Sequence, residues 1–411
     1  MQVTDRAGAA EATVQAGSAQ NGVSTAVLDW WRAWRSSLFP AIGAFIAFRV
    51  ITEVVAMVSL YGTHALQVVQ QSPGSLIAVW NRWDTGWYLD IARLGYAGSS
   101  HVLVAPGTYQ DGAAFAPLYP ALIRGTTDAL RVGPEFAAAL VGGVALVFAL
   151  IGVHRLASRE LGARGAMLVL VLLLAFPASF FLSALYPEPL LLACLVWCFL
   201  AARTRHWWAA SFFAGAAVLT KTYTVVLIVP LAIEYWAQHG WSLRRLRADS
   251  IAVVAGPAIA LAGLVLYMQL RLGDGLRFVH AEAGWGREFA GPWTSIGRAV
   301  TDIGTAGAQF DSRLLAVFDI VSPLTLVAAG IYLWRRRQPA YAAFMLLAAG
   351  VFLCSGTLQS DGRYTLTVFP IFIAGAMLLR KHPMITAAAV AGSCVLGGYF
   401  LHEFANSQFV G

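Results

Sequence analysis

The stretch from residue 81 to residue 96 brings aromatic rings, two carboxylates and two guanidinium groups together in the order NRWDTGWYLDIARLGY. Asp84 stands between Trp83 and Trp87, beside the first long apolar run. A carboxylate near a membrane surface can have its pKa tuned to remove a proton from an incoming hydroxyl, which is the task of a general base. The alternative is a helix N-cap, because Asp84 also precedes a plausible helix. The residue types alone leave both roles open.

A second carboxylate, Glu188, lies in the short connection SALYPEP at residues 183–189, between two apolar runs. An acid at membrane depth is costly, so it is a functional candidate by default. The alternative is an acid in the first turn of the next helix, where it stabilises the helix dipole.

Two cations, Lys221 and Arg363, fall at the predicted outer ends of apolar runs. A phosphate group is the natural partner for cations in that position. The alternative is snorkelling of the long side chains to the interface. Arg49 and Glu53 lie four residues apart on one helical face, which favours a buried pair joining helices over a place in the site.

Several motifs are absent from the sequence. It has no glycine-rich phosphate loop and no paired-glycine dinucleotide fingerprint, and its eight histidines are scattered. The four cysteines all fall inside apolar runs, which favours core packing over disulfides or thiolate metal sites. We therefore expect no cofactor, no divalent metal and no soluble nucleotide substrate.

The elements that must position these residues are membrane helices. Of 411 residues, 58% are hydrophobic and only 12% are charged, and the mean hydropathy is +0.66; soluble domains carry about 25% charged residues. The chain is predicted to be an all-α polytopic membrane protein. Its net charge of +7 comes from short basic clusters between apolar runs, which the positive-inside rule explains better than nucleic-acid binding.

A membrane span needs about 20 mostly apolar residues, and eleven candidates meet that standard. They lie near 36–60, 136–155, 164–183, 187–203, 206–221, 222–238, 249–271, 314–334, 339–358, 364–380 and 384–402. We expect residues 1–28 to form a disordered cytoplasmic tail, with no cleaved signal peptide, and residues 29–411 to form one membrane domain.

Basic residues in alternate connections predict the topology. Fifteen of them fall on one side, which we assign to the cytoplasm: Arg32, Arg35, Arg155, Arg159, Arg164, Arg203, Arg205, Arg244, Arg245, Arg247, Arg335, Arg336, Arg337, Arg380 and Lys381. The other side receives two long loops, at about 61–135 and 272–313. In the first loop, 85–96 predicts an amphipathic helix and 115–123 a short interfacial or re-entrant helix.

With these residues in view, the chain resembles the PIG-V family of mannosyltransferases, in the GT-C class of membrane glycosyltransferases. The resemblance covers about 40–380 and rests on five groups of residues: Arg82-Trp83-Asp84 with Trp87-Tyr88, Ile91-Ala92 with Gly95-Tyr96, Phe115 to Tyr119-Pro120, Ser183 to Glu188, and Arg363-Tyr364 before Pro370. The first group is the most specific. Where the family often has Tyr-Ser-Glu, this chain has Tyr186-Pro187-Glu188.

The resemblance implies a multi-span GT-C bundle that takes a sugar, most often mannose, from a polyprenyl-phosphate donor and inverts the anomeric carbon. It implies that Asp84 is the catalytic base and that Lys221 and Arg363 bind the donor phosphate. The remaining candidates for substrate binding are Arg49, Arg82, Trp83, Trp87, Tyr88, Tyr119, Tyr186, Glu188 and Tyr364.

The arginine-rich clusters and the Ala/Gly-rich tail are typical of a high-GC bacterium, so we expect a plasma-membrane enzyme with its site outside the cytoplasm. The acceptor would be a hydroxyl on a glycolipid or another extracytoplasmic glycan or protein. The alternative function is a transporter or flippase of polyprenyl-linked lipids, but transporters tend to have paired, similarly interrupted halves. We find no such halves in the sequence.

Overall fold

The computed structural model describes residues 35–61, 75–99, 101–105, 108–242, 247–304 and 310–410. The predicted tail, 1–28, lies outside the described residues. The described chain is almost entirely helical, with one two-stranded hairpin, β1 (His101–Ala105) and β2 (Thr108–Asp111). This confirms the predicted helical class.

Five described helices are long and apolar enough to cross a membrane. They are Arg35–Leu60, α6 (Pro134–Leu174), Ala248–Leu272 with α10 (Ala252–Leu272) as its main part, α13 (Phe310–Arg335) and α17 (Pro383–Ala405). The pair α15 (Asp361–Thr367) and α16 (Pro370–Leu379) passes the same test together but bends by 80°. The chain therefore has several membrane-spanning helices.

Four further helices in the described chain match predicted spans but are shorter. They are α7 (Glu188–Arg203), α8 (Trp207–Thr220), α9 (Ile228–Gln238) and α14 (Pro339–Leu353). The predicted span at 222–238 begins instead as the 3-10 turn η4 (Thr222–Leu227) before α9. The remaining predicted spans coincide with the long helices, apart from the breaks that glycine and proline introduce.

Glycine and proline explain those breaks. Gly162 has φ +73°, which divides α6 into two helical parts, as the separate predicted spans 136–155 and 164–183 require. The second part ends at Leu174, short of 183, and Pro177 follows in the turns that lead to η3 (Ser179–Leu182). The predicted span 364–380 is not continuous either, because Pro370 begins a new helix after the bend.

The two predicted outer loops fold into small elements. The first contains α3 (Ser75–Ala78), α4 (Thr85–Leu94), η1 (Tyr96–Gly98), the hairpin, η2 (Gly112–Ala114) and α5 (Leu118–Leu130). The second contains α11 (Arg277–His280), η7 (Ala281–Trp285) and α12 (Pro292–Gly304). The expected helices at 85–96 and near 115–123 are therefore present as α4 and α5, although α5 starts only after Pro117.

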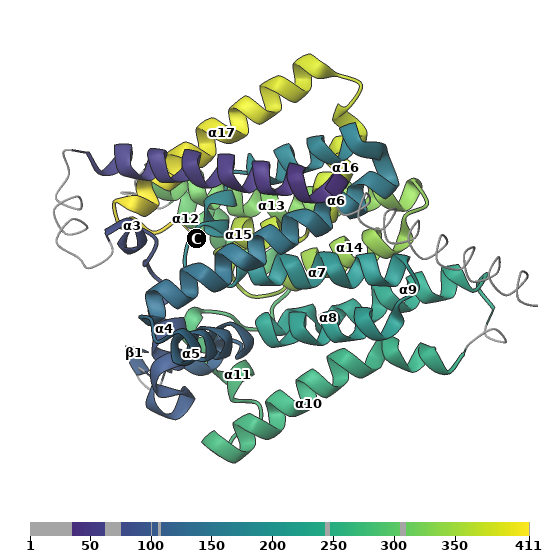
Figure 1. Ribbon diagram of the computed structural model, residues 1–411. Helices are drawn as coiled ribbons and strands as arrows, with labels where there is room; N and C mark the ends of the chain where they lie inside the picture. The colour runs from purple at the N-terminus through teal and green to yellow at the C-terminus, as the bar shows by residue number, and fades with distance from the viewer. Residues whose placement is uncertain are drawn as a thin grey trace, which may run out of the picture.

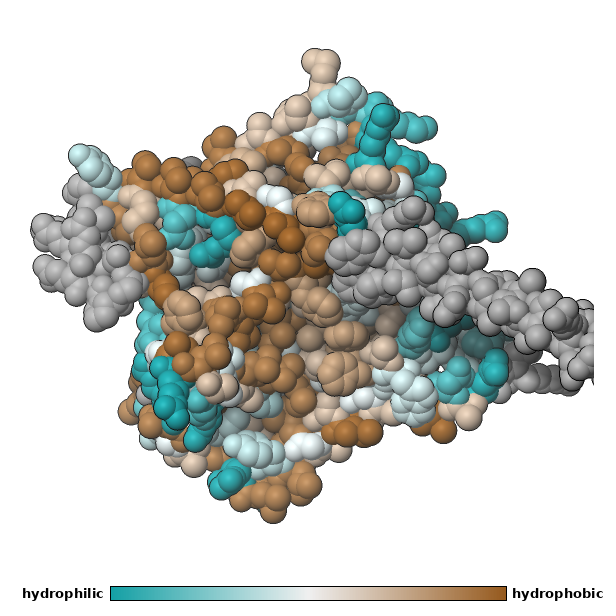
Figure 2. All heavy atoms as spheres, in the orientation of Figure 1, coloured by the Kyte–Doolittle hydropathy of each residue, from teal (hydrophilic) through white to brown (hydrophobic). Residues whose placement is uncertain are grey.

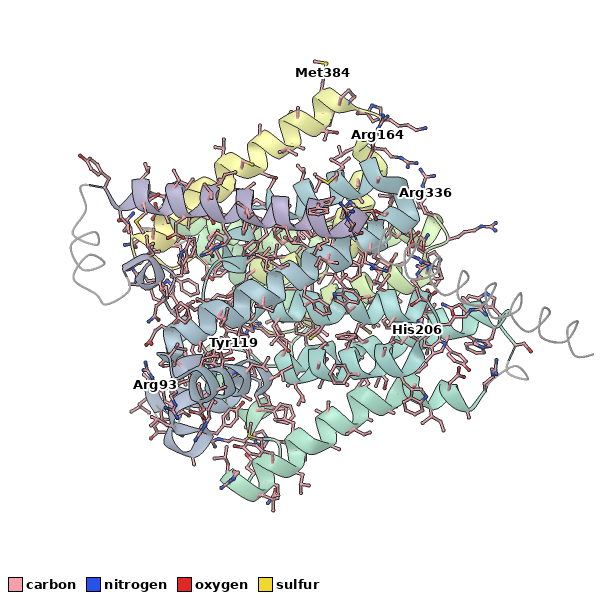
Figure 3. All side chains as sticks on the ribbon, viewed as in Figure 1. Arg93, Tyr119, Arg164, His206, Arg336 and Met384 are labelled. Atoms are coloured by element: carbon pink, nitrogen blue, oxygen red, sulfur yellow. The ribbon has the colours of Figure 1, made fainter. Side chains whose placement is uncertain are left out.

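The helices pack side by side into a bundle, with α4, α5, β1 and α11 at one end (Figure 1). Apolar side chains cover much of the face in Figure 2, while polar ones gather mainly toward its two ends. Figure 3 shows Arg164, Arg336 and His206 at the end opposite Arg93 and Tyr119. The basic connections and the folded loops thus lie at opposite ends.

Candidate active site

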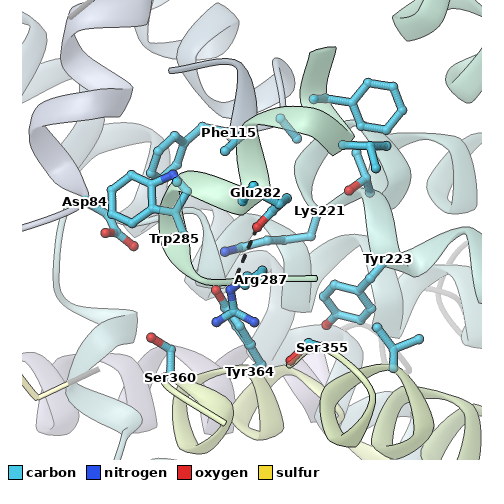
Figure 4. Close-up of a pocket in the computed structure, with 18 of the residues that line it drawn as sticks. Asp84, Phe115, Lys221, Tyr223, Glu282, Trp285, Arg287, Ser355, Ser360 and Tyr364 are labelled. Carbon is cyan, nitrogen blue, oxygen red and sulfur yellow. Dashed lines mark ion pairs between the residues drawn. The ribbon is translucent and has the colours of Figure 1, made fainter. Parts of the chain in front are cut away.

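A cavity of about 1250 Å³ opens at the loop end of the bundle. Its walls come from the start of α4, from η4, α10 and α14, and from the segment between α11 and α12. Ten of its residues are labelled in Figure 4, including Asp84, Lys221, Glu282, Trp285, Arg287 and Tyr364. The cavity joins both outer loops to the apolar helices.

Asp84 lines this cavity at the first residue before α4. Its φ and ψ of −59° and −20° are helical, and its side chain makes no capping hydrogen bond. Instead, Nη1 of Arg363 donates to Oδ2 of Asp84 at 2.8 Å. The capping alternative is therefore wrong, and the carboxylate is held by an ion pair that faces the cavity.

Arg363 is 3% exposed and lies between two carboxylates. Besides Asp84, its Nε lies 3.4 Å from Oε1 of Glu188, which is fully buried. Its guanidinium also stacks on Tyr186 at 5.1 Å. Within the described chain, neither carboxylate oxygen of Glu188 has a hydrogen-bond partner. Glu188 is also the first residue of α7, so the dipole role holds as well.

Tyr186 fixes the turn that carries Asp84. Its hydroxyl donates to the backbone carbonyl of Arg82 and accepts from the backbone N–H of Asp84, each at 3.2 Å. Trp83 has φ +50°, an uncommon value for a bulky residue. The turn is therefore tied to the segment before α7, about a hundred residues away.

A group of cations surrounds the ring of Tyr364 on the cavity wall, and Arg363 belongs to it, with its guanidinium carbon 5.1 Å from the ring centroid. Nζ of Lys221 is 4.5 Å from the ring centroid, and the guanidinium carbon of Arg287 is 5.1 Å from it. Arg287 also donates to the backbone carbonyl of Gln359 at 2.6 Å. Its Nε is 3.8 Å from Oε2 of Glu282, the ion pair dashed in Figure 4.

Arg287 and Glu282 were missed by the sequence analysis. Both lie in the second outer loop, where no span boundary or motif draws attention to them. The sequence gives no local signal for Arg287, which is one of eight arginines in the two predicted outer loops.

Aromatic rings form another wall. Trp87 stacks on Phe115 with centroids 5.8 Å apart, and Trp285 contacts both rings edge-on at 5.5–5.6 Å. Tyr88 also packs edge-on against Phe115, at 5.0 Å. Trp83, at the rim, meets Phe409 near the chain's C-terminus at 5.2 Å.

Some predicted site residues lie outside the cavity lining. Arg82 donates to the carbonyls of Ala78 and Asn81, and buried Tyr119 donates to the carbonyl of Ala138. Both side chains form hydrogen bonds to backbone carbonyls and do not line the cavity.

The predicted pair of Arg49 and Glu53 is present at 3.6 Å. Arg49 also donates to the carbonyl of Ser183 at 3.0 Å, and Nε1 of Trp80 donates to Glu53 at 2.9 Å. The pair joins the first helix to two connections, as predicted for a pair that links parts of the bundle. It does not line the cavity.

Among the described residues, no group of three or more His, Cys, Asp or Glu side chains is placed to hold a metal ion.

No family model matches the chain, and no curated protein matches it. Among solved structures, the chain is similar to ArnT from Cupriavidus metallidurans bound to undecaprenyl phosphate, at 17% identity and a TM-score of 0.41, over 89% of this chain and 78% of that one. It is also similar to the oligosaccharyltransferase of Archaeoglobus fulgidus, at 14% identity and a TM-score of 0.42, over 89% of this chain and 53% of that one.

Proposed function

We propose that this chain is a membrane glycosyltransferase of the GT-C class, which moves a sugar from a polyprenyl-phosphate donor to an acceptor hydroxyl. The observation that carries the proposal is the makeup of one cavity. It presents the carboxylate of Asp84, held by Arg363, together with Lys221 and Arg287, which share the Tyr364 ring with Arg363. A single displacement at an anomeric carbon needs one base and one stabilised leaving phosphate.

Asp84 is the base in this proposal. The acceptor oxygen forms a bond to the anomeric carbon, the bond from that carbon to the phosphate oxygen breaks, and the acceptor proton goes to Asp84. Because Arg363 is buried and also meets Glu188, it keeps Asp84 in one orientation.

Lys221 and Arg287 bind the leaving phosphate in this proposal. The sequence analysis paired Lys221 with Arg363, but Arg363 is engaged by two carboxylates. Arg287 takes its place because it lines the same cavity beside Lys221 and its ion pair with Glu282, at 3.8 Å, is longer than the two ion pairs of Arg363. Cations placed where the phosphate charge develops lower the barrier for its departure.

The apolar part of the cavity supports a lipid-linked donor. Leu261 and Val265 of α10 line it, and Val351 and Phe352 of α14 line it from another helix. These helices are apolar, so the wall suits an acyl or isoprenoid chain next to the phosphate patch.

Mannose as the sugar, and a glycolipid or other extracytoplasmic glycan as the acceptor, rest on the PIG-V resemblance. The cytoplasmic N-terminus rests on the positions of the basic residues, and the bacterial plasma membrane rests on the arginine-rich clusters and the Ala/Gly-rich tail. In support, Arg164 and Arg336 lie at the end opposite the loops that form the cavity (Figure 3).

The test is to incubate the purified protein in detergent with labelled polyprenyl-phosphate mannose and a panel of glycolipid acceptors. Formation of a labelled product is expected. If the protein instead moves the labelled lipid across reconstituted vesicles and forms no product with any donor sugar, the transporter alternative is correct and the proposal fails.

A further inference from the structure

One turn, η7, carries two side chains into the cavity. Glu282 and Trp285 both line the cavity, and both lie within Ala281–Trp285. Trp285 is drawn between Asp84 and Glu282, and Glu282 beside Lys221 and Arg287, in Figure 4. Glu282 therefore lies close enough to Arg287, Lys221 and Asp84 to interact with their charges.

Glu282 interacts electrostatically with charged groups at both ends of the site. Burial raises its pKa above the ordinary value of 4.5, Arg287 and Lys221 act in the opposite direction, and the charge of Asp84 raises the pKa further. Its one ion pair in the described chain, to Arg287, measures 3.8 Å, which is beyond hydrogen-bond distance. The carboxylate thus lies among charged groups with its hydrogen-bonding capacity available to a ligand.

Trp285 offers a flat apolar ring and one polar atom. Its Nε1 is buried and has no hydrogen-bond partner among the described residues. A buried donor without a partner calls for an explanation, and a ligand oxygen supplies one. An indole ring beside a carboxylate suits a pyranose, which presents C–H groups on its face and hydroxyls around its edge.

The turn is held firmly against the β-hairpin. A Cβ at Gly284 would lie 2.1 Å from the carbonyl oxygen of Tyr109, so only glycine allows this approach. Nearby, Arg277 of α11 makes two contacts with the carboxylate of Asp111, at 2.6 Å and 2.8 Å. Glu282 and Trp285 are thus placed by contacts between the two outer loops.

We propose that Glu282 and Trp285 form the subsite for the sugar ring of the donor, with Glu282 accepting hydrogen bonds from hydroxyls on two adjacent carbons. This inference rests on the proposed glycosyltransferase function and adds the residues that select the sugar. The phosphate lies at Lys221 and Arg287, the anomeric carbon points toward Asp84, and the ring lies across η7.

The test compares donors with and without those hydroxyls. Polyprenyl-phosphate mannose and a set of its monodeoxy and dideoxy analogues are assayed with the wild-type protein, with Glu282→Gln, and with the control Glu135→Gln. Glu135 pairs with Arg93 on the outer surface, away from the cavity lining. Binding of polyprenyl phosphate, which carries no sugar, is measured for all three proteins.

Glu282→Gln is expected to lower kcat/KM with the complete sugar by about 10- to 100-fold, because hydrogen bonds to a charged group are lost. With the analogue that lacks both contacted hydroxyls, the variant and the wild type should react at similar rates. The variant should bind polyprenyl phosphate at least as tightly as the wild type, because a negative charge near the patch is removed. Glu135→Gln should behave as wild type throughout.

An equal loss with every donor overturns the inference, and so does a loss of polyprenyl-phosphate binding in Glu282→Gln. No change with any donor overturns it too. If the wild-type protein transfers no sugar from any donor, the proposed function itself fails, and that result is distinct from the others.

Discussion

Two charged clusters lie at opposite ends of the bundle and differ in what surrounds them. At the basic end, Arg203 lies 3.6 Å from Glu160 and 3.4 Å from Glu234, and it donates to Gln338 at 2.7 Å. Gln338 in turn donates to Glu160 at 3.1 Å. This inner network links α6, α7 and α9 to the residue that precedes α14, and amide side chains satisfy its carboxylates.

The outer cluster has similar residue types but a different arrangement. Arg363 meets Asp84 and Glu188, and the carboxylate oxygens of Glu188 have no hydrogen-bond partner within the described chain. The cluster also borders a large cavity with aromatic and apolar walls. A polar cavity of about 550 Å³ adjoins the inner network, lined only by charged and amide side chains. The difference is what the proposed function requires: a structural role for the cluster around Arg203 and a chemical role for the cluster around Arg363.

The largest expected effect comes from Asp84→Asn. Removing the base should lower sugar transfer by about a thousandfold or more, since general bases contribute about 10²–10⁴. The protein should remain folded, because the amide can still accept from Arg363. Transfer rate and thermal unfolding would be measured beside the control Asp90→Asn, on the same helix but outside the cavity lining. Near-normal transfer by Asp84→Asn would contradict its assignment.

Arg203→Met should lower the stability of the protein but not its activity, which is the opposite of the effect expected for Asp84→Asn. Removing the one guanidinium of the inner network leaves two carboxylates unpaired, a change that costs about 3–5 kcal/mol when the pair is buried. The melting temperature should fall sharply, while the activity per folded molecule stays near that of the wild type. Circular dichroism on heating and transfer assays at low temperature would show this. A loss of activity without a loss of stability would contradict the proposal that this cluster is structural and the other is chemical.

Lys221→Met tests whether the phosphate patch binds the lipid donor. The KM for the lipid donor should rise about 10- to 100-fold, because one charged contact to the phosphate is lost. Lys381→Met is the matched control, since Lys381 is the other lysine of the chain and is exposed at the basic end. An unchanged KM in Lys221→Met would place the phosphate elsewhere.

The smallest expected effect is on how the melting temperature depends on pH. The pKa of Glu282 is raised by burial, so the folded protein holds this proton more tightly than the unfolded chain does. The resulting stabilisation is fully present below about pH 4.5 and is lost as the pH rises through the raised pKa. The melting temperature of the wild type should therefore fall relative to that of Glu282→Gln as the pH rises above 4.5. Parallel pH curves for the two proteins would contradict this.

The sequence alone predicted the helical membrane class, α4, and the start of α7 at Glu188. Local patterns determine these features, because apolar length, helical periodicity and proline act over neighbouring residues. The same reasoning selected Asp84, Trp87, Lys221, Arg363 and Tyr364, and all of them line one cavity.

Only the tertiary structure decided which of those residues meet. Asp84 and Arg363 are 279 residues apart, and no local pattern predicts that one guanidinium pairs with Asp84 and Glu188 rather than facing a phosphate. Arg287 and Glu282 enter the site because η7 packs on the hairpin at Gly284. Such contacts depend on how helices and loops pack across the whole bundle. Local patterns along the chain therefore do not predict them.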